Sequence, residues 1–416
     1  MLTIFNYLLI SNIFTGAFVF NNGYFDLYIA YIFMASFLLS YGFFYRKIII
    51  NWNFFYILAA ISFLSLINVL LGNNSLPSLL KIVFGFIFNS VTYYLLIRLN
   101  GNKVDGLFRI YLRIACLVAL IGIVQEIIYL LGFEGWYDFR SFIPRTVRPY
   151  IQFGILRVTS IMQEPAHLGA ALAPALFVSV LNLVQGTKYF ISKKASCLVL
   201  VCVLLTFSLI SYIGIVIAFI LIMLNYRGAK LIIAGILILL ILGFTVYTSF
   251  PDIRLRINDT ITLIGGKKPI EKVNLSTFAV YSNGFVTYKS FRTSPLFGLG
   301  LGSHPLSYDH YISQVIDPAK IHYSLNREDA SGLFLRLLSE TGLLGIFLVI
   351  YFIFKFYVSK RRDARFWVIS NAVICIFILN LLRQGNYFYN GFIFFVWLYY
   401  FTFKNSQIGK TLIKPV

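Results

Sequence analysis

A glutamate and a histidine three residues apart mark the part of this sequence best suited to chemistry. Glu164 and His167 lie in the stretch RVTSIMQEPAHLGAALAP, which begins at Arg157. Carboxylates and imidazoles are common general bases, and positions three, four or seven apart share a helix face. We therefore expect Arg157, Glu164 and His167 to face one cavity, with Pro165 bending the helix or starting it afresh. The alternatives are a structural ion pair for Glu164 and a packed, hydrogen-bonded His167.

The segment before this stretch is rich in arginine. Residues 133–157 contain two acidic residues, Glu134 and Asp138, and four basic ones: Arg140, Arg145, Arg148 and Arg157. A guanidinium stays charged and donates parallel hydrogen bonds to phosphate. These residues are therefore candidates for binding a phosphorylated ligand, and the alternative is binding to anionic lipid headgroups.

The composition excludes an ordinary soluble domain. Of 416 residues, 59% are hydrophobic, 18% aromatic and only 12% charged, with a mean hydropathy of +0.82. The net charge of +20 does not indicate nucleic-acid binding, because lysines and arginines punctuate apolar runs instead of forming one basic face. The four cysteines, at 116, 197, 202 and 375, lie in apolar runs without metal-ligand spacing. We expect an all-α polytopic membrane protein without a bound metal or cofactor.

Apolar runs of the length that crosses a hydrocarbon core predict about twelve membrane helices. They cover residues 2–20, 25–45, 52–71, 78–97, 107–132, 158–185, 195–209, 211–226, 230–249, 331–357, 366–382 and 391–403. The first run has no basic start and no small-residue cleavage site, so we expect a retained helix. The chain divides into N-terminal helices (1–132), an external segment and helices with the catalytic motif (133–249), a large external loop (250–330) and C-terminal helices (331–416).

The distribution of basic residues predicts the topology. A break near Ser208, Ser211 and Gly214 divides one long apolar run into two helices. With this break, most lysines and arginines between helices fall on one side, which the positive-inside rule places in the cytoplasm. Both termini are then cytoplasmic, and 133–157 and 250–330 lie outside.

Three stretches resemble the bacterial O-antigen and capsule repeat-unit polymerases of the Wzy type, which are related to O-antigen ligases. The first is RVTSIMQEPAHLGAALAP. The second, FRTSPLFGLGLGS at 291–303, is similar to the family's Pro-x-x-Gly-x-Gly loop. The third, SGLFLRLLSETGLLGIFLV at 331–349, is similar to its helix with Glu followed by Gly-x-x-Gly. The likeness covers residues from about 110 to 385, and the three motifs follow in the family's order.

The resemblance implies a membrane-embedded glycosyltransferase of the C-type superfamily that uses no nucleotide sugar. Its donor and acceptor would be glycans carried on undecaprenyl diphosphate, joined at the outer face of the membrane, and a chain-length regulator is a possible partner. Ligases of the family carry a His-Asn pair before the Glu-containing helix, where this chain reads NREDASGLFLRLLSE. This departure favours a polymerase, although His304, His310 and His322 leave a ligase as an alternative.

The assigned roles follow from this reaction. Glu164 is the first candidate base and His167 the second. Arg157 is the first candidate for stabilising the diphosphate, and the other proposed substrate contacts are Arg145, Arg148, Arg292, Arg336, Glu340 and Arg383. Arg336 and Glu340 are four residues apart and can instead pair with each other. The first external hairpin, NNGYFD, lacks the paired acids of metal-dependent members of the superfamily.

Two features of the long loop are predicted from its pattern. Aromatic residues at near-helical spacing between Phe278 and Phe291 predict an amphipathic helix on the outer leaflet. The glycines of PLFGLGLGS predict a tight turn rather than a dinucleotide loop, because the third helix-packing glycine and the βαβ context are missing.

Two other classes remain open. A lipid-linked oligosaccharide flippase or other transporter would explain the helices and arginines, but it predicts two repeated halves, which the sequence does not show. A non-catalytic membrane scaffold that binds anionic lipid is the third possibility.

Overall fold

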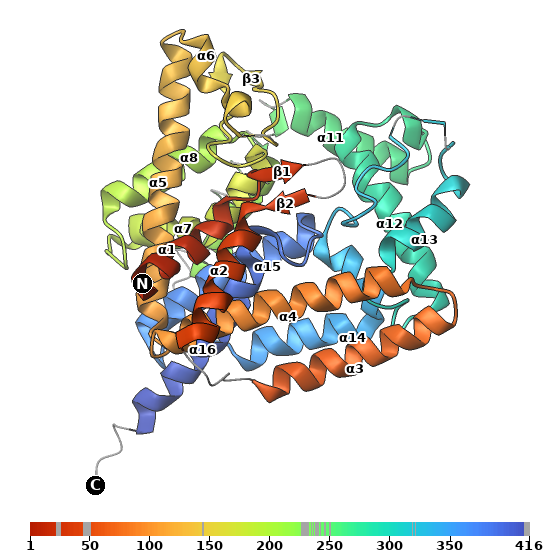
Figure 1. Ribbon diagram of the computed structural model, residues 1–416. Helices are drawn as coiled ribbons and strands as arrows, with labels where there is room; N and C mark the ends of the chain where they lie inside the picture. Colours follow the sequence, from red (N-terminus) through yellow and green to blue (C-terminus); the bar gives the residue numbers. More distant parts are fainter. Residues whose placement is uncertain are drawn as a thin grey trace.

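The computed structural model describes residues 1–21, 26–44, 51–143, 145–225, 251–317, 319–320 and 322–411, with single helical positions between 233 and 248. In chain order the elements are α1 (Leu2–Ser11), η1 (Asn12–Phe14), β1 (Val19–Asn21), β2 (Asp26–Tyr28), α2 (Ile29–Phe44), α3 (Trp52–Leu70), α4 (Leu76–Leu99), α5 (Val104–Leu130), α6 (Glu134–Tyr137), η2 (Phe139–Ser141), β3 (Ile151–Gln152), β4 (Ile155–Leu156), α7 (Pro165–Gln185), α8 (Lys193–Leu205), α9 (Leu209–Asn225), α11 (Pro251–Ile264), η3 (Ile270–Lys272), α12 (Leu275–Thr293), α13 (His304–Tyr311), η4 (Ile312–Gln314), α14 (Leu333–Lys355), α15 (Ala364–Arg383), η5 (Tyr389–Gly391) and α16 (Phe392–Thr411), where η marks a 3-10 helix (Figure 1).

Six of the described helices are long and apolar enough to cross a membrane: α3, α4, α5, α7, α14 and α15. Strand structure in the described chain is limited to two short antiparallel hairpins, β1–β2 and β3–β4, with Val19 opposite Tyr28 and Ile151 opposite Leu156. The chain is therefore a helical, membrane-embedded protein. The total of about twelve spans stays a prediction, and the predicted helix 230–249 lies mostly outside the described residues.

Two predicted helix boundaries are wrong, one in the run 2–20 and one in the run 158–185. The run 2–20 is not one helix, because α1 ends at Ser11 and a 3-10 turn at Asn12–Phe14 leads into β1. The run 158–185 becomes helical only at Pro165. Proline at the first helical position is favoured, since its missing N–H would be unpaired there anyway.

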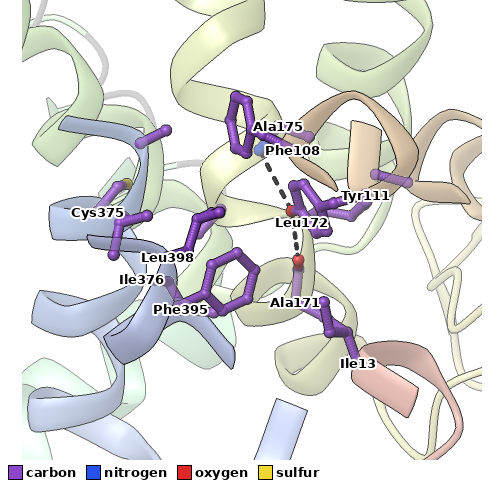
Figure 2. Close-up of a cluster of buried hydrophobic side chains, with 14 of the residues drawn as sticks. Ile13, Phe108, Tyr111, Ala171, Leu172, Ala175, Cys375, Ile376, Phe395 and Leu398 are labelled. Carbon is purple, nitrogen blue, oxygen red and sulfur yellow. Dashed lines mark hydrogen bonds between the residues drawn. The ribbon is translucent and has the colours of Figure 1, made fainter. Parts of the chain in front are cut away.

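Helix α7 forms the centre of the main core. It packs against α8, α9 and α15, and its small residues permit close approach; a Cβ on Gly169 would lie 2.0 Å from Ser211 Oγ. Pro174 lies inside α7 and cannot donate a backbone hydrogen bond. Next to it the Tyr111 hydroxyl donates to Ala171 O (2.8 Å) and accepts from Ala175 N (3.3 Å), two groups that an unbroken helix would pair with each other (Figure 2).

The predicted break after the seventh run is confirmed as a break between helices. Helix α8 ends at Leu205 and α9 begins at Leu209. The Thr206 hydroxyl donates to Val203 O at 2.7 Å, and Thr206 Oγ1 accepts from the Ser211 hydroxyl (2.7 Å) and from Ser208 N (3.3 Å). These bonds satisfy polar groups that the chain exposes where it leaves the helix.

The predicted glycine turn is inserted into a break in α14. Helical geometry stops at Gly342, with φ 59° and ψ −152°. The turn donates from Leu299 N to Ser339 O (3.0 Å) and from Gly300 N to Glu340 O (2.8 Å), while Leu343 N donates back to Pro295 O at 2.9 Å. The second and third sequence motifs are thus joined by main-chain hydrogen bonds, which satisfy the groups that the broken helix leaves unpaired.

Residues 251–330 fold as helices α11, α12 and α13, which gather on one side of the molecule in Figure 1. They have a small core of their own, including Leu263, Phe278 and Ile312. The predicted helix at 278–291 is confirmed as part of α12, but its aromatic residues do not form one face. Phe278 is buried, whereas the Tyr288 side chain is exposed.

Candidate functional site

A polar pocket of about 360 Å³ lies at the N-terminus of α7. Its walls come from five separate parts of the chain: the end of β2, residues 163–167, the start of α12, the turn 325–329, and the segment 383–389 that follows α15. It brings Glu164 and His167 together with Arg383, Asp329 and Tyr389.

Glu164, His167 and Tyr389 form a hydrogen-bonded line in this pocket. His167 Nε2 lies 3.1 Å from Glu164 Oε1, and His167 Nδ1 lies 2.7 Å from the Tyr389 hydroxyl. The geometry follows from the start of α7, because Glu164 is its extended N-cap residue and His167 comes one turn later. A helix N-terminus also stabilises a carboxylate.

The partners of His167 fix its tautomer. An ionised Glu164 only accepts hydrogen bonds, so Nε2 carries the proton and Nδ1 accepts from the Tyr389 O–H. Burial, and next the Glu164 carboxylate, raise the pKa of the Tyr389 phenol well above its usual range. Tyr389 therefore remains a donor at neutral pH, and the imidazole holds the Glu164 carboxylate in one orientation.

Arg383 supplies the cation of the pocket. It lies in the last turn of α15, and its Nη1 is buried without a hydrogen-bond partner among the described residues. Asp329 is held differently, since its Oδ1 accepts from Asn326 Nδ2 (2.9 Å) and from Ser331 N (3.1 Å). A buried guanidinium donor without a partner is costly in an empty site, and it suits an anionic group on a ligand.

Arg145 lies behind one wall of the pocket. It pairs with Asp26, donates to the Tyr28 hydroxyl at 3.0 Å and lies over the Tyr28 ring, 5.7 Å from its centre. Tyr28 itself lines the pocket. Arg148 is exposed and lies outside the pocket lining.

The prediction that Arg157 shares a helix face with Glu164 and His167 is wrong. Arg157 directly follows β4, and α7 begins only at Pro165. Its Nε donates to Thr206 O at 3.5 Å, its guanidinium lies 5.6 Å from the Tyr150 ring centre, and it does not line the pocket. Arg292 is likewise outside, exposed at the end of α12 above the Tyr288 ring.

The predicted pair of Arg336 and Glu340 forms, with 2.9 Å between Nε and Oε1. Both residues are buried behind the pocket wall. Arg336 Nη1 donates to Gly385 O at 3.1 Å, and the Tyr387 hydroxyl donates to Glu340 Oε2 at 2.8 Å. The pair therefore holds the segment 384–389 in place and does not itself line the pocket.

No model of a known protein family matches this chain, and no curated protein sequence matches it. The function must therefore be inferred from the sequence motifs and from the residues gathered in the pocket.

Sequence reasoning missed several residues that line the pocket, among them Tyr389 and Asp329. Tyr389 belongs to the polar stretch RQGNYFYN between two apolar runs, and Asp329 to NREDAS before α14. Polar residues between membrane helices were the signal for both. The sequence does not show which of these polar residues face Glu164, because that depends on the contact between the segments around Asp329 and Gly385. This contact is close: a Cβ on Gly385 would lie 1.3 Å from Asp329 O.

The arrangement can take up a proton and stabilise an anion in the same pocket. Glu164 is oriented by a neutral imidazole, as a general base requires, and Arg383 presents an unused donor. Among the described residues, no group of three or more His, Cys, Asp or Glu side chains is arranged to hold a metal ion.

Proposed function

We propose that this protein is a membrane glycosyltransferase that joins oligosaccharide repeat units carried on undecaprenyl diphosphate into a longer polysaccharide, at the outer face of a bacterial plasma membrane. The observation that carries the proposal is the convergence of Glu164 and His167 with Arg383 and the loop residue Asp329 in one polar pocket. The sequence motifs supply the first two of these residues, and the pocket adds a cation suited to the diphosphate.

The reaction uses the pocket residues as follows. The hydroxyl oxygen of the acceptor glycan attacks the anomeric carbon of the donor and forms the new glycosidic bond. The bond from that carbon to the phosphate oxygen breaks, and the leaving lipid diphosphate takes the electron pair. The Glu164 carboxylate accepts the proton of the hydroxyl. His167 and Tyr389 hold this carboxylate in its orientation. A positioned base typically contributes a factor of about 10² to 10⁴ in rate.

Arg383 stabilises the charge that develops on the departing diphosphate. Its Nη1 is buried without a hydrogen-bond partner among the described residues, so it gives up no existing protein hydrogen bond when it binds the developing charge. Removing one such donor typically lowers kcat about 10² to 10³-fold. The geometry favours Arg383 for this role over Arg157, which has its own contacts elsewhere.

The test is polymerisation of short lipid-linked repeat units by purified protein, read as a ladder of products. We expect Glu164→Gln and Arg383→Ala each to slow ladder formation at least about 100-fold. Matched controls outside the pocket are Glu271→Gln and Arg292→Ala, both at exposed positions, and these should retain the activity. Full ladders from both pocket variants, at normal protein levels, would disprove the assignment.

A further inference from the structure

His304 is a fully buried histidine that the proposed reaction does not use. It is the first residue of α13, directly after the glycine turn, and its exposed fraction is 0%. Both ring nitrogens have partners on neighbouring helices: Nδ1 lies 3.0 Å from Ser339 Oγ on α14, and Nε2 lies 3.0 Å from Asn283 Oδ1 on α12. The imidazole therefore connects three helices.

The hydrogen-bond pattern assigns the proton on His304. The two N–H groups of the Asn283 amide face three acceptors, Ala279 O (2.8 Å), Leu325 O (3.2 Å) and Ser331 Oγ (3.3 Å), which fixes the orientation of the amide. Asn283 Oδ1 can only accept, so His304 Nε2 must carry the proton and Nδ1 is an acceptor. The donor beside Nδ1 is the Ser339 hydroxyl, whose proton Nδ1 shares with Arg336 O, 3.1 Å from the same oxygen. Burial, and next the Arg336 and Arg327 cations, lower the pKa of His304 to about 3, so the ring stays neutral.

Asn283 carries this constraint to the pocket. Its partners Leu325 and Ser331 bracket the turn 325–331, which brings Asn326 and Asp329 to the pocket wall. Within the turn, Ser331 N donates to Asp329 Oδ1 at 3.1 Å.

The turn needs such an external constraint. Asn326, Ala330 and Ser331 all have positive φ angles, of 58°, 56° and 62°. Non-glycine residues in this region are uncommon, and they persist where the surrounding structure holds them there. Asn283 supplies two of the side-chain bonds that hold the turn against α12, to Leu325 O and Ser331 Oγ, and Ser331 Oγ supplies a third by donating to Ala279 O at 3.0 Å.

We propose that His304 is a positioning residue: through Asn283 it holds the turn 325–331 in the conformation that presents Asn326 and Asp329 to the bound substrate. The role of the turn in binding substrate rests on the proposed function, whereas the effect of His304 on the conformation of the turn does not. Neither His304 nor Asn283 lines the pocket, so their influence on the reaction is exerted through this turn.

Two substitutions separate the two ends of the imidazole. In His304→Gln the amide can reach the place of Nε2 and donate to Asn283, but the bond to Ser339 is lost. In His304→Asn the shorter amide can replace Nδ1 beside Ser339, and the bond to Asn283 is lost. Ser339→Ala removes the bond to His304 Nδ1, together with the contact of the hydroxyl with Arg336 O within α14, and leaves the bond to Asn283; it is the matched control.

The first measurement is hydrogen–deuterium exchange of the peptide covering 325–331 in the full-length protein, which requires no substrate. We expect at least tenfold faster exchange in His304→Asn than in the wild type, with His304→Gln and Ser339→Ala close to the wild type. Equal exchange in His304→Asn and His304→Gln, whether raised or unchanged, would overturn the proposal. Asn283→Leu tests the same connection if His304→Asn does not fold, and unchanged exchange in it would have the same meaning.

The second measurement is the polymerisation assay. We expect His304→Asn to raise KM for the lipid-linked repeat unit about tenfold with a smaller change in kcat, and His304→Gln to restore KM. A matching loss in both variants would indicate a packing role. If the wild-type protein makes no polymer, the proposed function fails. The hydrogen–deuterium exchange result still decides whether His304 holds the turn.

Discussion

At the scale of single residues, the site depends on which hydrogen bonds Glu164 and His167 make. Glu164, His167 and Arg383 were predicted from their types and positions, and the structure gathers them in one pocket. The helical position of Arg157 was inferred by extending an apolar run back to residue 158. The helix begins at Pro165 instead, and the preference of proline for the first helical position was the signal against that extension.

Tyr389→Phe tests the orientation of His167 at this scale. The substitution removes the hydroxyl that donates to His167 Nδ1 at 2.7 Å but keeps the ring that packs on the imidazole, 4.6 Å between centres. The imidazole then keeps its hydrogen bond to Glu164 through Nε2, but Nδ1 has lost its donor and the ring is held at one end only. A lost hydrogen bond of about 1 to 2 kcal/mol corresponds to a fall in polymerisation rate of roughly 5 to 30-fold.

The matched control for Tyr389→Phe is Tyr281→Phe on α12, whose side chain is partly exposed and lies outside the pocket lining. It should keep the wild-type rate. Equal rates for Tyr389→Phe and the wild type would show that the tyrosine hydroxyl does not orient the base.

At the scale of elements, the sequence predicts individual helices and turns better than the contacts between them. The glycine turn and the helix with Glu340 were each predicted from local patterns. Their interlocking at Gly342 could not be, because it joins main-chain groups of residues more than 40 positions apart, such as Pro295 and Leu343. The same is true of the turn at Asp329, which lies against Gly385.

Gly342→Ala tests the break in α14. The backbone there has φ 59° and ψ −152°, a region essentially restricted to glycine, and a Cβ would lie 2.6 Å from Pro295 O. We expect a loss of stability of roughly 2 to 3 kcal/mol or more, seen as a lower midpoint of thermal unfolding in detergent.

Gly284→Ala is the matched control for this prediction. Gly284 lies inside α12, and no heavy atom lies within 4 Å of a Cβ built there. Alanine is the better helix former by about 1 kcal/mol, so this substitution should leave the midpoint unchanged or raise it. A midpoint for Gly342→Ala as high as that of Gly284→Ala would show that α14 is not held broken at this position.

At the scale of the whole molecule, the two segments predicted to lie outside the membrane meet at the pocket. Arg145 of the segment 133–157 holds Tyr28 at one wall, and Asp329 of the long loop forms another. From this pocket α7 extends 21 residues to Gln185, a length of about 30 Å. That length matches the hydrocarbon core of a bilayer.

The cations at the other end of α7 complete the argument for orientation. Lys188, Lys193 and Lys194 follow its C-terminus, as expected for residues on the cytoplasmic side. Because one membrane-length helix separates them from Glu164, the pocket and these lysines should lie on opposite faces of the membrane. The pocket would then open to the side where lipid-linked glycans are polymerised.

Single cysteines labelled with a membrane-impermeant maleimide test this orientation in intact cells. Arg148→Cys and Glu271→Cys occupy exposed positions in the two predicted external segments, and Lys188→Cys is exposed beyond the far end of α7. In a background lacking the exposed Cys197, the first two should react in intact cells and the third only after permeabilisation. Labelling of Lys188→Cys in intact cells, with protection of the other two, would place the pocket in the cytoplasm and contradict polymer assembly outside.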